Sequence, residues 1–215
     1  MSQRIQLESA TVAAFLNELA SGSPAPGGGS ASAMAGATGA ALTSMVANLT
    51  IGRAKYRDNE PAMKEILGRS ESARKEFARL VEEDMQSFDR VMEAYRLPKN
   101  SPEEVEARKA AIENALKGAC AVPLRTMRLS LECLGLAEQA ARLGNANALS
   151  DAAVSGLLLR AAVAGAGYNV LINLTGIADE GFRRETLTTH DTIIREAEDT
   201  WSRIRSVVEQ GVVVR

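Results

Sequence analysis

The stretch SPAPGGGSASAMAGATGAALTSMVANLTIG, residues 23–52, carries no charged side chain. It opens with a turn rich in Pro and Gly and continues in small residues. A membrane span needs about 20 strongly apolar residues, whereas Ala, Gly, Ser and Thr have transfer energies near zero. No Lys-Ser or Lys-Thr pair follows the glycines, which excludes a Walker-type phosphate loop. We therefore expect a soluble helix over residues 30–51 whose small side chains allow another helix backbone to approach closely.

A second uncharged stretch of the same kind, AAVAGAGYNVLINLTGIA, covers residues 161–178. Two helices with small-residue faces can pack against each other within one subunit or across a dimer. Both arrangements remain open from the sequence. Together the two helices present more uncharged surface than one small bundle hides, so we expect a homodimer.

The remaining segments repeat their apolar residues with the period of a helix, and none alternates as a strand does. Ser101 and Pro102 begin a helix with acidic residues in its first turn, and Pro123 should bend that helix because it lacks a backbone donor. The sequence thus predicts one all-α domain over residues 1–215, a bundle of long helices with a kink at Pro123 and no sheet. The other helices are expected over residues 9–20, 61–95, 151–177 and 180–209.

Composition excludes several classes of partner. The formal net charge is −2 and basic residues form no arm or patch, which argues against nucleic acid and anionic membranes. The N-terminal MSQRIQLES has no apolar signal core, so we expect a cytoplasmic protein. Cys120 and Cys133 lack CxxC spacing and the chain has one histidine, so we expect neither a structural zinc nor another metal cofactor.

Asp84 is the most informative single residue. It lies four residues after Leu80 and four before Phe88, within an apolar stripe on one face of the helix expected over 61–95. A carboxylate on such a face is costly unless it is paired, and it often marks a functional site. The alternative is a buried structural partner of an Arg or Asn. The stripe comprises Phe77, Leu80, Val81, Phe88, Val91, Met92 and Tyr95.

Five further residues have two interpretations each. Ser150 and Asp151 suit an ordinary helix start, where a carboxylate complements the helix dipole. Asn169 and Asn173 lie four apart on an apolar helix, so each either locks two helices together or faces a polar ligand. Arg160 is the only charge between Asp151 and Asp179, and it is either an unpaired surface residue or a binder of a ligand carboxylate.

A basic group, Arg53, Lys55 and Arg57, follows the helix expected over 30–51. Cations at a helix C-terminus compensate its dipole, which is the structural alternative to ligand binding. His190 is expected to be a partly buried surface residue. With a single histidine, the usual serine and cysteine triads cannot be built, so acid–base work falls to carboxylates, Lys or Tyr.

Four segments taken together resemble the cyclodeaminase/cyclohydrolase family of folate one-carbon metabolism. They are SPAPGGGSASAMAGATGAALTSMVANLTIGRAKY, VEEDMQSFDRVMEAYRLPK, CAVPL and GNANALSDAAVSGLLLRAAVAGAGYNVLINL. The resemblance implies an all-helical homodimer with a folate pocket near the subunit interface. It also implies one of two reactions, namely hydrolysis of 5,10-methenyltetrahydrofolate or cyclisation of 5-formiminotetrahydrofolate with loss of ammonia. The chain has no room for the transferase domain of the bifunctional relatives, which favours the cyclohydrolase.

The resemblance also assigns residues. It suggests Asp84 as cation stabiliser or general base, Asp151 as its partner or a pterin anchor, and Lys55 for proton transfer or for binding a glutamyl carboxylate. GRAKY replaces the more lysine-rich GKKKY expected of the family, with Arg53 in place of a lysine. Two rival classes remain, a non-catalytic helical scaffold that only oligomerises and a membrane-associated bundle. The motif positions expected to contact substrate are Pro26, Gly27, Gly28, Gly29, Ser30, Tyr56, Asn147, Ser150, Asn169 and Asn173, with Arg53 and Arg160 as basic candidates beside them.

Overall fold

The computed structural model describes residues 11–211, and within them all regular secondary structure is helical, without a strand. This confirms the all-α bundle. Two short 3-10 segments, η1 (Ala54–Asn59) and η2 (Ala146–Ala148), connect longer helices. The helices are α1 (Val12–Leu19), α2 (Gly28–Asn48), α3 (Glu60–Tyr95), α4 (Pro102–Leu143), α5 (Leu149–Leu174) and α6 (Glu180–Gly211).

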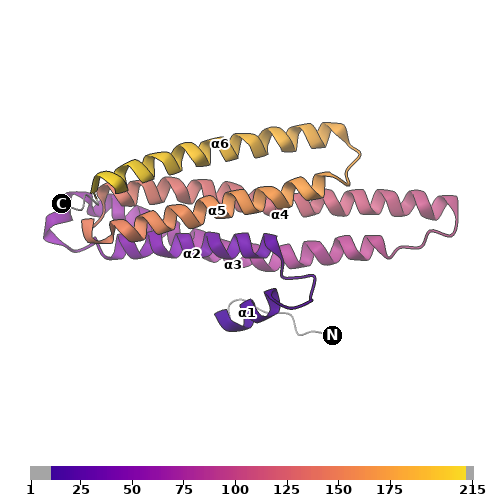
Figure 1. Cartoon of the computed structure of the whole chain (residues 1–215), viewed down its shortest axis with the longest axis horizontal. Helices are drawn as coiled ribbons and strands as arrows, with labels where there is room; N and C mark the ends of the chain where they lie inside the picture. The colour runs from indigo at the N-terminus through magenta and orange to yellow at the C-terminus, as the bar shows by residue number, and fades with distance from the viewer. Residues whose placement is uncertain (1–10, 212–215) are drawn as a thin grey trace.

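Helices α2 to α6 run along the long axis of the molecule, and α1 lies beside this bundle (Figure 1). The hairpin of α3 and α4 extends past the first residues of α2. Helix α5 packs against α2, α4 and α6, and α2 also packs against α3. Helix α2 is therefore packed between α3 and α5.

The two uncharged helices do pack against each other within one subunit. A Cβ added at Gly39 of α2 would lie 2.6 Å from the Leu159 side chain of α5. The Ser155 hydroxyl donates to the Gly39 carbonyl at 2.8 Å and lies 2.8 Å from the Thr43 hydroxyl. Gly36 meets α3 instead, since a Cβ there would lie 2.5 Å from the Phe77 ring. The small residues of α2 thus serve close contacts on two sides inside the subunit.

Helix α4 continues through Pro123 as a single element of 42 residues. Pro123 cannot donate to the carbonyl four residues earlier, which belongs to Ala119. The side-chain amide of Asn173 on α5 donates to that carbonyl at 3.0 Å. A residue of the neighbouring helix thus supplies the hydrogen bond that Pro123 cannot make.

The apolar face expected on the first helix is buried only in part. Phe15 enters the main core, but Val12 is 72% exposed and Leu16 is 53% exposed. The reason is that α1 lies beside the bundle and only one side of it touches other helices (Figure 1). On α3, Phe77, Leu80 and Val81 are fully buried as expected, whereas Tyr95, at the end of the helix, is exposed. Residues 9 and 10 of the expected first helix lie outside the described residues.

One helical stretch in the described part of the chain, residues 146–174, is long and apolar enough by length and composition to span a membrane. It contains Asp151 and Arg160 and packs against three other helices. Only 39% of its most apolar window is buried in the subunit. Much of the apolar surface of α5 is therefore uncovered in a single chain.

Candidate active site

Three consecutive glycines, residues 27–29, lie where the turn before α2 meets the helix. Gly27 occupies the N-cap position and offers no side-chain hydrogen bond to the helix. The first backbone N–H groups of a helix have no partner within it, and they carry the positive end of the helix dipole. The turn itself is closed by the Ser23 hydroxyl, which donates to the Ala25 carbonyl at 2.8 Å, and Pro26 follows through a cis peptide bond. The start of α2 is therefore free to receive groups from other helices.

Asp84 of α3 occupies this helix start. Its Oδ2 accepts a hydrogen bond from the Ser30 hydroxyl at 2.8 Å. A Cβ added at Gly29 would lie 2.2 Å from Asp84 Oδ1, so only glycine leaves room for the carboxylate there. The glycines of the turn thus allow a carboxylate from another helix to lie directly against the α2 backbone.

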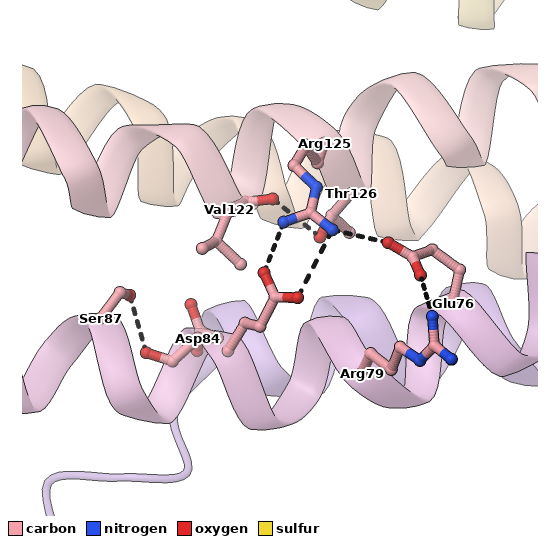
Figure 2. A network of polar contacts seen from close by, with 8 residues as sticks. Glu76, Arg79, Asp84, Ser87, Val122, Arg125 and Thr126 are labelled. Atoms are coloured by element: carbon pink, nitrogen blue, oxygen red, sulfur yellow. Dashed lines mark hydrogen bonds and ion pairs between the residues drawn. The ribbon is translucent and has the colours of Figure 1, made fainter.

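Burial raises the pKa of the Asp84 carboxyl above its ordinary value, and hydrogen bonds from the Ser30 hydroxyl and backbone N–H offset this rise only in part. Within residues 11–211, Asp84 takes part in no ion pair. Arg125 of α4 binds Glu76 and Glu83 of α3 instead (Figure 2). Asp84 is therefore not the structural partner of an Arg or Asn that the sequence left open. A carboxylate with a raised pKa and no paired cation is suited to proton transfer or to binding a cationic ligand.

Asn169 borders the same helix start. A Cβ added at Gly28 would lie 3.5 Å from its amide nitrogen. That nitrogen donates to the Gly165 carbonyl at 2.8 Å, and the amide oxygen has no hydrogen bond to a described residue. Asn173, one turn further along α5, uses its amide nitrogen on Ala119 as described above. Of the two alternatives for these residues, Asn169 faces the candidate site and Asn173 links two helices. We call Gly27, Gly28, Gly29, Ser30, Asp84 and Asn169 the α2 N-terminal cluster.

A second group of predicted residues gathers at the opposite end of α2. The Tyr56 hydroxyl accepts a hydrogen bond from the Ala146 backbone N–H at 3.0 Å, which ties η1 to the segment before α5. That hydrogen bond, followed by the charges of Lys55 and Arg53, lowers the pKa of the Tyr56 hydroxyl. The Lys55 ammonium lies 5.3 Å from the centre of the Tyr56 ring. We call Arg53, Lys55, Tyr56, Asn147, Ser150 and Asp151 the loop cluster.

Asp151 is the third residue of α5, in its acidic first turn. Ala148 occupies the N-cap position and makes no side-chain hydrogen bond there, so Ser150 is not the cap that an ordinary helix start would need. Asn147 and Ser150 are exposed, whereas Asp151 is half-buried. The SD motif therefore presents polar groups at the end of the bundle and is not used to cap α5.

The two clusters are far apart in one subunit. Helix α2 has 21 residues between them, and at about 1.5 Å per residue this is about 30 Å. A folate ligand at Asp84 would therefore be out of direct reach of Lys55 or Asp151 of the same chain. The resemblance grouped these residues as one site, but one subunit does not bring them together.

Two other named residues lie outside both clusters. The Arg160 guanidinium donates to Glu198 of α6 at 2.7 Å, so it is neither unpaired nor available to a ligand without losing that ion pair. His190 is buried against α5, and its Nδ1 lies 2.8 Å from Asp191. No group of three His, Cys, Asp or Glu side chains suited to a metal ion occurs within residues 11–211.

The sequence interpretation missed Asn145. This buried residue donates from its side chain to the Leu49 carbonyl at 3.2 Å and from its backbone to the Thr50 hydroxyl at 2.8 Å. Its side-chain oxygen accepts from the Asn147 backbone N–H at 3.1 Å. Asn145 therefore joins the end of α2 to the segment that carries the SD motif. The available signal was its place in the quoted motif GNANALSD, whose first asparagine is Asn145.

Known proteins share this fold and these motifs. A profile of the Formiminotransferase-cyclodeaminase family matches residues 11–192. The methenyltetrahydrofolate cyclohydrolase of Methylorubrum extorquens is 44% identical over 202 residues, which cover 94% of this chain and 97% of that protein. The formimidoyltransferase-cyclodeaminase of Rattus norvegicus is 36% identical over 87% of this chain but only 35% of its own length. The crystal structure of formiminotetrahydrofolate cyclodeaminase from Thermotoga maritima superposes with a TM-score of 0.86 at 33% identity, over 94% of this chain and 98% of that one. The chain belongs to the formiminotransferase-cyclodeaminase family.

Proposed function

We propose that this protein hydrolyses 5,10-methenyltetrahydrofolate to 10-formyltetrahydrofolate. The observation that carries the proposal is the Asp84 carboxylate, which lies against Gly29 and Ser30 at the α2 start without a paired cation among the described residues. 5,10-Methenyltetrahydrofolate is a delocalised amidinium cation, which a fixed carboxylate stabilises. The similarity to a cyclohydrolase over nearly the whole length of both proteins supports the same reaction.

The reaction proceeds by addition of water to the one-carbon centre between the two folate nitrogens. Asp84 accepts a proton from the attacking water as the C–O bond forms, which gives a neutral tetrahedral carbinolamine. The carbon–N5 bond then breaks while N5 gains a proton and the new hydroxyl loses one, leaving the formyl group on N10. One proton is released overall. The backbone N–H groups at the α2 start can bind the oxygen that becomes the formyl carbonyl.

The second candidate reaction, cyclodeamination of 5-formiminotetrahydrofolate, has its own supporting observation. The Thermotoga maritima cyclodeaminase matches this chain over 98% of its own length. The length of the chain, on which the sequence argument for the cyclohydrolase relied, therefore does not separate the two reactions. The higher identity to the cyclohydrolase, 44% against 33%, is what favours hydrolysis.

A side-by-side assay of both substrates tests the reaction. Methenyltetrahydrofolate absorbs in the near ultraviolet and loses this band on ring opening. We expect EDTA-treated protein to accelerate that loss, because we propose a reaction that uses neither metal nor cofactor. Turnover of formiminotetrahydrofolate alone, with release of ammonia, would instead assign the cyclodeaminase. If neither folate is turned over and neither raises the melting temperature, the protein would be a non-catalytic scaffold.

We further propose a homodimer formed by the exposed faces of α2 and α5. Val154, Leu157, Tyr168 and Ile172 follow one another at helical spacing on α5, and all are exposed. Tyr168 is 73% exposed and Ile172 is 65% exposed, which is unusual for an otherwise apolar helix. Met45 of α2 is also an exposed apolar residue. A second copy of the chain is a self-complementary cover for such a face.

Light scattering tests this dimer. We expect a dimer at micromolar concentration and a folded monomer after Tyr168→Glu with Ile172→Glu, since these charges would be buried without partners. Leu187→Glu on α6 is the matched control, because Leu187 is also an exposed apolar residue and lies on another helix. A monomeric wild type would contradict the proposal, as would a double variant that remains dimeric.

The dimer proposal accounts for the two separated clusters. If the two-fold axis crosses α2 and α5 near their middle, the α2 start of one subunit meets the α2 end of the other. Each active site would then contain Asp84 and the glycines from one subunit, with Lys55 and Asp151 of the partner subunit. We also propose a cytoplasmic location, which the two free, buried thiols of Cys120 and Cys133 support.

A further inference from the structure

Ser30 is enclosed on every side. Ser30 is 0% exposed, and its hydroxyl has two oxygen atoms within hydrogen-bonding range. Asp84 Oδ2 lies at 2.8 Å and the Val81 carbonyl oxygen at 3.5 Å, both from α3. The resemblance placed Ser30 among the residues that contact substrate, but its hydroxyl is taken up by Asp84. A ligand at the surface of the cluster therefore meets Asp84 before it meets Ser30.

A hydroxyl can serve both protonation states of a carboxyl group because it donates and accepts. While Asp84 is ionised, the Ser30 hydroxyl donates to Oδ2. Once Oδ2 carries a proton, the same hydroxyl can accept from it and turn its own hydrogen towards the Val81 carbonyl. Both states find a partner without movement of the backbone, and the absence of a side chain at Gly29 lets the carboxylate remain in place.

Other charged groups have little influence at this point. Helix α2 contains no charged residue, and α5 has none between Arg160 and Asp179. From α4, Arg125 is bound to Glu76 and Glu83 of α3 (Figure 2). Burial raises the pKa of Asp84, and the hydrogen bonds from the hydroxyl and backbone N–H of Ser30 lower it. Ser30 is thus the polar neighbour whose change should be felt most directly by Asp84.

We propose that Ser30 is a positioning residue, which holds Asp84 in place and supplies a hydrogen bond to it in both of its protonation states, and which does not contact the folate. The inference rests on the proposed function, because it assumes that Asp84 exchanges a proton during turnover. It assigns the PAPGGGS motif two tasks. The glycines let the carboxylate and a ligand approach the α2 backbone, and the serine positions the carboxylate through a hydrogen bond.

Ser30→Ala tests the inference, with Ser44→Ala as the matched control. Ser44 is also a buried serine of α2, and its hydroxyl pairs with that of Ser70 at 2.8 Å, away from Asp84. Loss of the donor to the ionised carboxylate should move the acidic limb of the kcat/KM profile to higher pH. We expect kcat at neutral pH to fall about tenfold, the usual scale for a hydrogen bond to a charged group, and KM to stay within about twofold. Ser44→Ala should leave the profile unchanged.

A double-variant cycle completes the test. If Ser30 acts through Asp84, Ser30→Ala should cause no further loss of turnover in a protein that already carries Asp84→Asn. Three results would each overturn the inference. The losses of turnover from Ser30→Ala and Asp84→Asn could multiply in the double variant. Ser30→Ala could raise KM without moving the acidic limb of the pH profile, or it could have no effect. A wild type that turns over neither folate would instead overturn the proposed function, so the two failures are distinct.

Discussion

The two ends of α2 differ in almost every physical respect. At its start, glycines without side chains bring Asp84 against the backbone in a partly buried environment, without a paired cation among the described residues. At its end, Arg53 and Lys55 are exposed, and Tyr56 holds the segment through one hydrogen bond to Ala146. Burial raises the pKa of a carboxylate and suits it to proton transfer, whereas exposed cations bind anions weakly and in a salt-dependent manner. We therefore propose that the reaction takes place at the α2 start and that the far end binds the anionic part of the substrate.

The largest effect is expected from Asp84→Asn, which keeps the shape of the side chain and removes its charge. Turnover should fall at least about 100-fold, the usual low end for loss of a general base. Stability should be unchanged or slightly higher, because the desolvation cost of the carboxylate disappears and no described cation is left unpaired. Thermal melting and steady-state kinetics measure the two outcomes separately. An early-melting variant with full turnover per folded molecule would return Asp84 to a structural role.

Gly29→Ala should cost nearly as much activity through geometry alone. The new Cβ would lie 2.2 Å from Asp84 Oδ1, so the carboxylate must move, and a displacement of about 1 Å can cost about 100-fold in rate. Gly36→Ala is the matched control, since its Cβ would lie 2.5 Å from the Phe77 ring, away from Asp84. We expect the control to lose about 1–3 kcal/mol of stability by overpacking and to retain its turnover when folded. Equal kinetic losses in both variants would contradict the special role of the α2 start.

A smaller effect is expected at the far end from Lys55→Ala. If Lys55 binds a substrate carboxylate, KM should rise about tenfold with little change in kcat, which corresponds to about 1.4 kcal/mol. Added salt should weaken binding by the wild type more than by the variant, because salt screens exposed charges. Arg57→Ala provides the control, as Arg57 is another exposed cation of the same segment. A fall in kcat at unchanged KM would assign Lys55 to proton transfer instead.

The smallest effect concerns the pH dependence of stability. The pKa of Asp84 is raised above its ordinary value of 3.8, mainly by burial. The folded state therefore binds this proton more tightly than the unfolded state, and the stabilisation is fully present below pH 3.8 and lost as pH rises through the folded pKa. We expect the free energy of unfolding of the wild type, relative to Asp84→Asn, to improve as pH falls from 7 towards 4. Denaturant titrations at a series of pH values measure this difference, and an opposite slope would mean that the pKa is lowered.

The sequence predicted features that depend on local spacing. Helical periodicity gave the long helices, and Asp84 was identified because one charge interrupts an apolar stripe on α3. It could not predict partners that depend on how helices are aligned. That Asn173 would cover the Ala119 carbonyl follows from the register of α5 against α4 beside Pro123. The separation of Lys55 from Asp84 follows from the direction of α2, which a similarity of motifs does not reveal.

The most direct test of the account is whether the two ends of α2 cooperate across subunits. One differently tagged subunit carries Asp84→Asn and the other carries Lys55→Glu with Asp151→Asn, and the mixed dimer is purified by both tags. A site shared between subunits leaves one of the two sites of the mixed dimer intact, so we predict about half of the wild-type kcat/KM, far above either parent. A mixed dimer no more active than its parents would contradict the account and would confine each active site to a single subunit.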